Sequence, residues 1–536
     1  MGIEKLLVAN RGEIALRVFR ACRRLGIATV AVAPDDDAAS LHARSADETV
    51  RIRSYLDADE HVRAAQESGA AAIHPGYGFL AENADFAEAV ESAALTWVGP
   101  PPAALRAGGD KLAAKRIARE AGVPVVPEGE PEEIAFPLVV KAAAGGGGRG
   151  MRVVREPAEL DEAKAAAGRE AKAAFGDERV FCERYVERPR HVEIQLLGDS
   201  HGTIVTLGER DCSVQRRHQK VLEESPSPAL DPDLRARMSE AAVAFARAIG
   251  YRNAGTAEFM LDGRDFWFLE LNGRIQVEHP VTELVSGADL VAEQIRIAHG
   301  EPLRAEPRLV GHAVEVRLYA EDPRSFLPQT GTLERLRLPS SIRVDAGVER
   351  GDAIGTSYDP LIAKLIAHGS TRDDALDRLA AALAETDVGG VVTNLPFLRW
   401  LVAHPALRAG EATTAFLTEH PPLSAPPLRL PDRPWRGGFR LNLPPPPPAP
   451  PPDPDAAHDS QGSREQSSLS APMPGTVIRV LVVEGDRVEP RQPLVVLEAM
   501  KMETPVVSPY GAVVRAVHVA EGERVAGGTV LVELEE

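Results

Sequence analysis

The sequence lacks several features that define common functional classes. No apolar run among its 536 residues could span a bilayer, and the first residues, MGIEKLLVAN, lack the basic and apolar regions of a signal peptide. The three cysteines, Cys22, Cys182 and Cys212, form no CxxC pair, which argues against a disulfide framework and a thiolate metal site. A net charge of -18 disfavours nucleic acid as a partner. We therefore expect a cytoplasmic protein that binds small ligands and protein partners, with no nucleic acid and no membrane.

A proline-rich segment divides the chain. Residues 423–468 combine runs of proline with a polar tail and show little apolar periodicity. The run at 444–452 favours a polyproline II spacer, and the polar tail after it favours a loose chain. This composition predicts either a linker that carries a mobile domain or simple surface filler.

The region after this segment contains an internal repeat. Residues 475–498 realign on residues 511–535, and each half alternates short valine-rich strands with an EGDRV or EGERV turn. The repeat predicts a small all-β unit made of two similar halves. Lys501, in the stretch LEAMKMET, falls between the halves, where we expect a tight exposed turn. This lysine is either a solvated side chain or a site that a modifying enzyme recognises.

The N-terminal region follows an α/β pattern. A strand-like run at 5–9, a segment at 10–26 with apolar residues at helical spacing, and a second strand-like run at 28–33 predict a βαβ unit. No GxGxxG follows the first strand, which disfavours a dinucleotide site. Residues 71–83 contain two glycines and a proline and predict an irregular loop.

A glycine-rich segment lies between two strand-like runs. Gly145 to Gly148 and Gly150 offer backbone N–H groups that can wrap phosphate oxygens. The segment does not end in GK[ST] and opens no helix, so it is not a P-loop. Lys141, on the strand before it, could neutralise a phosphate. The alternative is a flexible surface hairpin.

Two acidic residues face each other on a predicted hairpin at 255–280. With a three-residue loop, Glu258 falls opposite Glu270, and two such carboxylates repel unless a cation lies between them. Oxygen ligands from this pair and from Asn272 suit Mg2+ or Mn2+. If the second strand continues, its polar residues alternate on one face as far as Glu278. The alternative is a solvated sheet face with partly cancelling charges.

A basic cluster precedes this hairpin. Residues 208–226 predict an anion-binding site, because they gather cations in an acidic protein. No aromatic residues interleave with these cations, so phosphate or bicarbonate fits better than nucleic acid. The cations are Arg210, Arg216, Arg217, His218 and Lys220.

At this point several motifs together carry a family resemblance. HPGYGFLAEN, GGGGRGM, RDCSVQRRHQK and ELNGRIQVEHPVTE resemble the biotin carboxylase family of ATP-grasp enzymes, and PMPG with EAMKMET resembles a biotin carboxyl carrier domain. The whole chain is similar to the α subunit of a bacterial acyl-CoA carboxylase. The resemblance implies an α/β and α+β ATP-grasp carboxylase with a Rossmann-like N-terminal domain and a C-terminal all-β flattened barrel or sandwich. The implied parts are an N-terminal domain at 1–115, an ATP-grasp domain at 116–330 with a glycine-rich lid at about 128–185, a carboxylase C-terminal domain at 331–422, the linker at 423–468 and the biotinyl domain at 469–536.

The resemblance also implies a role for each matching residue. The ATP-binding residues would be Lys111, Lys141, Gly145, Gly146, Gly147, Gly148, Gly150, Glu183, His191, Gln215 and His218. The metal ligands would be Glu258, Glu270 and Asn272, and the bicarbonate-binding residues Lys220, Arg274, Gln276 and Val277. Glu278 would be the general base, Arg343 would stabilise the biotin enolate, and Lys501 would be biotinylated.

The implied chemistry needs these residue types. Bicarbonate is a weak nucleophile, so a base must remove its proton while cations neutralise the phosphates of ATP. The cofactors would be covalent biotin, ATP and Mg2+ or Mn2+. The partners would be a separate carboxyltransferase β subunit, a biotin protein ligase and a second copy of the carboxylase part. The final acceptor would be acetyl-CoA, propionyl-CoA or another acyl-CoA.

Two other functions remain open at this level. Another ATP-grasp ligase, for carbamoyl phosphate or an amino acid, leaves Lys501 and the repeat unexplained. A non-catalytic biotinylated scaffold is disfavoured because Glu278 and Lys220 are both present.

Overall fold

The structure is a computed structural model. It describes residues 2–129, 131–134, 136–142, 151–175, 178–216, 219–305, 308–323, 326–355, 357–420, 468–471, 475–490, 492–499, 502–525 and 529–535. Several predicted features lie outside these residues: the glycines at 145–150, His218, Lys501 and the linker as far as residue 467.

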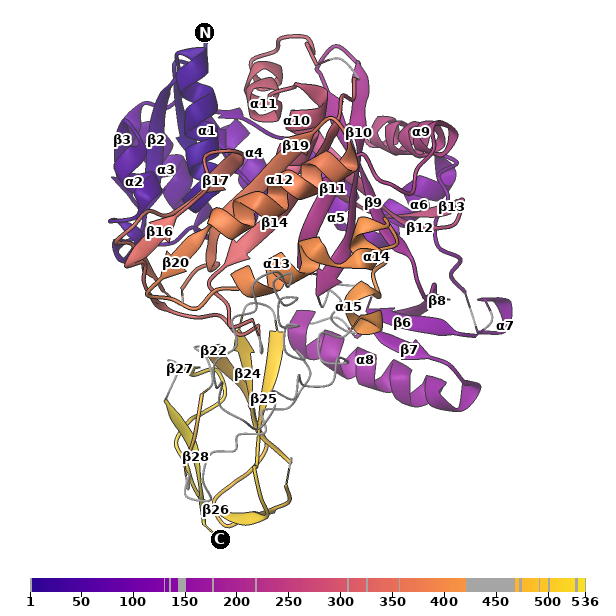
Figure 1. The fold of residues 1–536 in the computed structure, drawn as a ribbon, viewed down its shortest axis with the longest axis vertical. Helices are drawn as coiled ribbons and strands as arrows, with labels where there is room; N and C mark the ends of the chain where they lie inside the picture. The colour runs from indigo at the N-terminus through magenta and orange to yellow at the C-terminus, as the bar shows by residue number, and fades with distance from the viewer. Residues whose placement is uncertain are drawn as a thin grey trace, which may run out of the picture.

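The N-terminal region is a parallel sheet with helices beside it, which confirms the predicted βαβ unit (Figure 1). Its five strands lie in the order β3-β2-β1-β4-β5. Helix α1 buries Ile14, Val18 and Cys22 and ends at Gly26, which adopts the left-handed conformation. The elements are β1 (Lys5–Val8), α1 (Gly12–Leu25), β2 (Ala28–Ala33), α2 (Leu41–Ser45), β3 (Glu48–Arg51), α3 (Ala58–Ser68), β4 (Ala72–His74), α4 (Ala84–Ser92), β5 (Thr96–Trp97), α5 (Pro102–Gly109) and α6 (Lys111–Glu120).

A small antiparallel sheet of three strands, in the order β7-β6-β8, follows. Strands β6 and β7 flank the glycine-rich segment, as the sequence predicts. Helix α8 packs on β6 and β7. The elements are α7 (Pro131–Ile134), β6 (Leu138–Ala142), β7 (Arg152–Val154), α8 (Leu160–Phe175) and β8 (Val180–Arg184).

An eight-stranded antiparallel sheet forms the centre of the carboxylase region, in the order β13-β12-β9-β10-β11-β14-β19-β17. Strands from both sides of residue 330 belong to this one sheet. The strands are β9 (Arg190–Gly198), β10 (Ile204–Arg216), β11 (Gln219–Ser225), β12 (Asn253–Asp262), β13 (Asp265–Asn272), β14 (His312–Tyr319), β17 (Arg343–Ala346) and β19 (Leu361–Gly369).

Helices cover this sheet and bury its apolar residues. Helix α12 lies across β14 and β19, and α9 lies beside β9 and β10 (Figure 1). In the described part of the chain, no helix combines the length and the apolar character needed to cross a membrane. The remaining elements are α9 (Pro232–Ala248), α10 (His279–Ser286), α11 (Leu290–Ala298), β15 (Gly331–Thr332), β16 (Arg335–Arg337), β18 (Ala353–Ile354), α12 (Arg372–Glu385), β20 (Asp387–Gly389), α13 (Leu395–Ala403), α14 (Pro405–Arg408) and α15 (Phe416–Glu419).

The C-terminal region is all β, as predicted from the repeat. Two four-stranded sheets have the orders β21-β28-β26-β23 and β25-β24-β22-β27. The two halves repeat the same strands, because β22, β23 and β24 correspond to β26, β27 and β28 in the sequence alignment. The strands are β21 (Ser468–Ser470), β22 (Gly475–Val480), β23 (Arg487–Val488), β24 (Pro493–Ala499), β25 (Met502–Val507), β26 (Ala512–Val517), β27 (Arg524–Val525) and β28 (Val530–Glu535).

Candidate active site

The β12–β13 hairpin brings the two predicted acids together. Glu258 pairs with Glu270 in the register of these strands, which confirms their predicted opposition. The loop, however, is not the three-residue loop expected from the sequence. Asp262 pairs with Asp265 across a two-residue turn, and a register shift between Glu258 and Phe259 restores the pairing of the acids.

Lys220 connects three carboxylates at the centre of the sheet. Its Nζ lies 2.5 Å from Glu193, 3.2 Å from Glu258 and 2.5 Å from Glu278. Glu193, Lys220 and Glu258 lie on β9, β11 and β12 of the central sheet, and Glu278 lies at the N-terminal end of α10. The sheet and this helix end thus bring the expected base and an expected metal ligand to one ammonium group. His191 adds a contact of 2.9 Å between its Nε2 and Glu258.

The charges in this cluster stabilise one another. Burial alone would raise the pKa of Glu258, but Lys220 and His191 lower it well below its ordinary value. Burial would lower the pKa of Lys220, but Glu193, Glu258 and Glu278 raise it well above its ordinary value. The site therefore holds charged side chains that compensate each other in place of solvent.

Residues 274–278 are not a continuation of β13, which corrects the alternating strand face predicted from the sequence. Strand β13 ends at Asn272, and Glu278 is the N-cap residue of α10. Gly273 and Pro280 lie on either side of this stretch and disfavour a regular strand. Arg274 still donates to Asn272 Oδ1 at 3.0 Å, and Gln276 donates to Glu258 Oε1 at 2.8 Å, so the turn keeps both residues at the site.

The predicted anion-binding cluster is only partly available to a ligand. Arg210 is fully buried, and protein side chains accept the hydrogen bonds of its guanidinium. The acceptors are Glu193, Gln195, Thr256, Thr282 and Gln276. Its role is structural, which corrects the sequence prediction. Arg216 is also buried, with its guanidinium 4.2 Å from the centre of the Phe326 ring. Of the described cations in this cluster, Lys220 is the one that contacts both Glu258 and Glu278.

Three of the predicted ATP-binding residues lie on α6 and the small sheet: Lys111 on α6, Lys141 on β6 and Glu183 on β8. His191 and Gln215 lie instead on β9 and β10 of the central sheet. Lys141 Nζ lies 2.5 Å from Glu183, and Lys115 of α6 also forms an ion pair with Glu183. Lys111 Nζ lies 3.9 Å from Glu270, which places it beside the hairpin. Gln215 donates to the Cys212 carbonyl at 2.9 Å on β10.

Sequence reasoning missed several buried charged residues that support the site. Glu193 lies on β9, and Arg317 on β14 contacts Glu278 at 3.1 Å. Lys364 on β19 is fully buried, and it donates to the Val277 carbonyl at 2.9 Å and contacts Glu13 of α1 at 3.0 Å. A charged residue within an otherwise apolar strand is the one sequence signal for these positions, since such residues are rarely fully buried unless paired.

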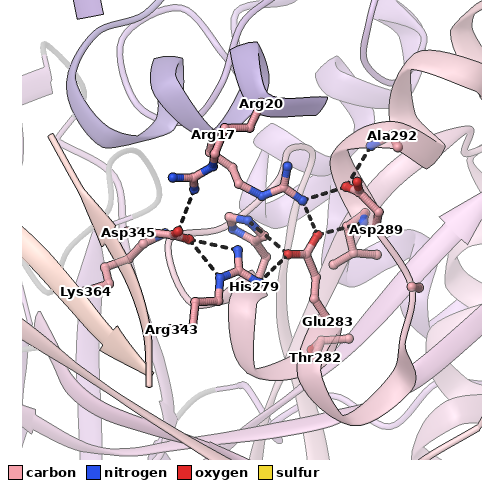
Figure 2. Close-up of polar contacts among 12 residues, drawn as sticks. Arg17, Arg20, His279, Thr282, Glu283, Asp289, Ala292, Arg343, Asp345 and Lys364 are labelled. Carbon is pink, nitrogen blue, oxygen red and sulfur yellow. Dashed lines mark hydrogen bonds and ion pairs between the residues drawn. The ribbon is translucent and has the colours of Figure 1, made fainter. Parts of the chain in front are cut away.

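Arg343 is separate from the Lys220 contacts but is linked to the same region. It lies at the start of β17, and its Nη1 lies 2.8 Å from Glu283 Oε2 of α10 (Figure 2). Glu278 is the N-cap residue of the same helix. Asp345 on β17 is in register with Lys364, which itself contacts Val277. Packing between α10, β17 and β19 thus relates Arg343 to the predicted bicarbonate-binding segment.

The acidic pair fits a divalent cation. Glu258, on β12, contacts Lys220, His191, Asn272 and Gln276. The Glu270 carboxylate, on β13, lies beside Lys111 of α6. Carboxylate and amide oxygens are the ligands that Mg2+ and Mn2+ prefer.

Four protein-family descriptions match consecutive parts of the chain. Residues 2–105 match "Biotin carboxylase, N-terminal domain" and residues 110–306 match "Carbamoyl-phosphate synthase L chain, ATP binding domain". Residues 315–419 match "Biotin carboxylase C-terminal domain" and residues 467–534 match "Biotin-requiring enzyme". The last match favours the biotin interpretation over other ATP-grasp ligases.

Curated relatives agree with these matches. The chain is 49% identical over 445 residues to a mitochondrial methylcrotonoyl-CoA carboxylase subunit alpha of Arabidopsis thaliana, covering 78% of this chain and 61% of that protein. It is 46% identical over 473 residues to a propionyl-CoA carboxylase alpha chain of Ruegeria pomeroyi, and the match covers 80% of this chain and 70% of that protein. The chain thus spans less than two thirds of the Arabidopsis protein.

A solved structure shares the fold. The biotin carboxylase domain of 2-oxoglutarate carboxylase from Hydrogenobacter thermophilus, a dimer in complex with MgADP, ADP and bicarbonate, is 44% identical, with a TM-score of 0.76. The match covers 78% of this chain and 98% of that one. The chain therefore belongs to the biotin carboxylase family, with a C-terminal domain of the biotin-requiring type.

Proposed function

We propose that this protein uses ATP and bicarbonate to carboxylate a biotin held on its own C-terminal domain, as the first half-reaction of an acyl-CoA carboxylase. The observation that carries the proposal is the contact of Lys220 with both Glu278 and Glu258, because it joins the expected base to an expected metal ligand. The family matches, and the MgADP and bicarbonate named for the Hydrogenobacter structure, support it.

The nucleotide would bind between the hairpin and the small sheet. Lys111 and Lys141 would neutralise its phosphates, and the glycines at 145–150 would cover them, while Glu183, His191, Gln215 and His218 would contact the rest of the nucleotide. Glu258, Glu270 and Asn272 would hold Mg2+ or Mn2+. When bound, the metal ion stabilises the negative charge that develops on the phosphoryl oxygens.

Glu278 would accept the proton of bicarbonate. Burial alone would raise the pKa of Glu278, but Lys220 and Arg317 lower it below its ordinary value, so the carboxylate is ionised at neutral pH. Arg274, Gln276 and Val277 would orient the bicarbonate beside it. As bicarbonate draws the Lys220 ammonium toward itself, the carboxylate loses part of this stabilisation and becomes a stronger base.

Arg343 would stabilise negative charge on biotin, and Lys501 would carry the biotin. A biotin protein ligase would attach it, and a separate carboxyltransferase subunit would pass the carboxyl group to an acyl-CoA. The relatives' names support methylcrotonoyl-CoA or propionyl-CoA as the acceptor. A dimer of the carboxylase part stays a prediction, as does the cytoplasmic location.

Intact mass after co-expression with a biotin ligase, followed by assay of ATP turnover, tests this function. We expect one biotinyl adduct that Lys501→Ala abolishes. Glu278→Gln should lower bicarbonate-dependent ATP turnover by orders of magnitude, because an amide cannot accept the proton. Glu301→Gln is the control, since Glu301 pairs with Arg304 away from the site. Wild-type turnover in Glu278→Gln would contradict the assigned base.

A further inference from the structure

Arg343 lies between two buried carboxylates from different parts of the chain. Its Nη1 donates to Glu283 Oε2 at 2.8 Å, and its Nε and Nη2 donate to Asp345 Oδ2 at 3.2 and 2.8 Å. Glu283 belongs to α10, the helix that begins after the expected base, and Asp345 belongs to β17. A guanidinium has more N–H groups than these bonds use, so Arg343 keeps donors for a ligand.

Each of these carboxylates is in turn held by an arginine of α1. Arg17 donates to Glu283 Oε1 at 2.6 Å, and Arg20 donates to Asp345 Oδ1 at 2.5 Å. Every acid thus directs one oxygen toward Arg343 and the other toward α1. Figure 2 shows both acids between Arg343 and the two arginines of α1. Three parts of the carboxylase region, α1, α10 and β17, meet in this cluster.

We propose that Glu283 and Asp345 are positioning residues that hold the Arg343 guanidinium in one orientation toward biotin, with Arg17 and Arg20 fixing the two acids from α1. The inference rests on the proposed function, which assigns Arg343 to biotin. A free arginine side chain loses rotamer entropy when it binds a ligand, and bonds made before the ligand arrives remove that cost from the reaction. A displacement of about 1 Å can lower a rate about a hundredfold.

Arg17 also provides a matched control. It donates to Asp289 Oδ1 at 2.6 Å, and Asp289 is the N-cap residue of α11. No contact between Asp289 and Arg343 occurs among the described residues. Asp289→Asn therefore changes a carboxylate of the same network without touching the Arg343 bonds, and asparagine is an equally good N-cap residue.

The experiment uses the full chain with Lys501→Ala and free biotin as the substrate, so that the measured rates do not depend on the extent of biotinylation of the chain. Two rates are measured: ATP cleavage with bicarbonate alone, and the additional cleavage that biotin induces. Glu283→Gln and Asp345→Asn should lower the biotin-dependent kcat by about ten- to a hundredfold and leave the bicarbonate-only rate unchanged. Asp289→Asn should leave both rates unchanged, and thermal melting checks that each variant is folded.

The outcomes separate this inference from the proposed function. Arg343→Lys should show the same selective loss. If it does, and Glu283→Gln and Asp345→Asn keep the wild-type biotin-dependent kcat, the positioning role is wrong. Equal loss of both rates would also overturn it, because that result indicates general damage. A wild-type chain without bicarbonate-dependent ATP cleavage would contradict the proposed function itself.

A second variant keeps the inference testable if the buried acids cannot be replaced. The Arg20 side chain is 44% exposed, so Arg20→Gln should fold. It removes the α1 support from Asp345 and leaves the Arg343 bonds in place. We expect a smaller loss of biotin-dependent kcat than in Asp345→Asn, in the same direction. No loss in Arg20→Gln would show that α1 does not contribute.

Discussion

At the residue scale, hydrogen bonds and burial together determine the protonation state of His74. The Gly76 N–H donates to His74 Nδ1 at 3.0 Å, so the ring proton lies on Nε2, which donates to Gln294 Oε1 at 3.2 Å. Burial lowers the pKa of His74 to about 4. The ring is therefore neutral in the folded protein near neutral pH. His74 is the last residue of β4, next to the loop that precedes α4.

This neutral histidine predicts a pH dependence of stability. Between about pH 6.5 and pH 4 the unfolded chain binds a proton at His74 that the folded chain does not bind. The contribution of His74 to the free energy of unfolding should therefore be fully present above about pH 6.5 and be lost as the pH is lowered through this range. Between about pH 7.5 and pH 5.5, the free energy of unfolding of His74→Gln should fall by about 1 kcal/mol less than that of the wild type, as measured by urea titration.

The control for this measurement is a histidine on the surface. His299 has a side chain that is 41% exposed. His299→Gln should keep the wild-type slope of unfolding free energy against pH. If His74→Gln also keeps the wild-type slope, His74 does not contribute as a neutral buried group.

At the element scale, the β12–β13 hairpin carries a repulsion between two carboxylates at the predicted metal site. Two carboxylates opposite each other on neighbouring strands repel, and this pair is retained although Glu258 alone has cationic partners at hydrogen-bond distance. We expect Glu270→Gln to weaken binding of Mn2+ in the presence of an ATP analogue, because one anionic oxygen ligand is lost. Electron paramagnetic resonance of Mn2+ measures this affinity.

A control on the same strand tests whether the effect is local. Asp265 is exposed at the turn of the hairpin, so Asp265→Asn removes a similar charge away from the expected metal ligands. It should keep the wild-type affinity for Mn2+. Equal affinity in Glu270→Gln and the wild type would exclude Glu270 as a ligand.

The sequence predicts elements where the signal is local. The βαβ unit at the N-terminus and the repeated strands of the C-terminal domain follow from periodicity and turn residues, and both are confirmed. The pairing of Glu258 with Glu270 is also confirmed, but a bulge produces it, and a bulge has no sequence signature here. The end of β13 at Asn272 depends on how the following turn packs, which the alternating pattern does not encode.

The sequence does not predict contacts between distant segments. Arg17, Glu283 and Arg343 come from α1, α10 and β17, and they meet only because the domains pack together. Arg210 is similar, since its position in a basic cluster suggests a ligand-binding role. Instead, residues of β9, of α10 and of the turn before α10 accept its hydrogen bonds. The resemblance to biotin carboxylases supplied roles for the site residues, but it did not supply the buried residues that hold them.

At the scale of the whole molecule, the chain combines a carboxylase region with a carrier domain. The eight-stranded sheet joins residues of the ATP-grasp and C-terminal matches, so the predicted metal ligands Glu258 and Glu270 belong to the same sheet as Arg343. The match at 467–534 lies in separate sheets of its own. This arrangement agrees with the proposed function, in which one region would activate bicarbonate and the other would carry the product.

Transfer of label from bicarbonate to the biotin that Lys501 is proposed to carry tests this central claim most directly. The biotinylated chain is incubated with radiolabelled bicarbonate and ATP with Mg2+, and the label that stays with the chain is measured at alkaline pH. We predict ATP-dependent label on the wild-type chain, and none in Lys501→Ala or Glu278→Gln. A biotinylated wild-type chain that cleaves ATP but acquires no label would contradict the account.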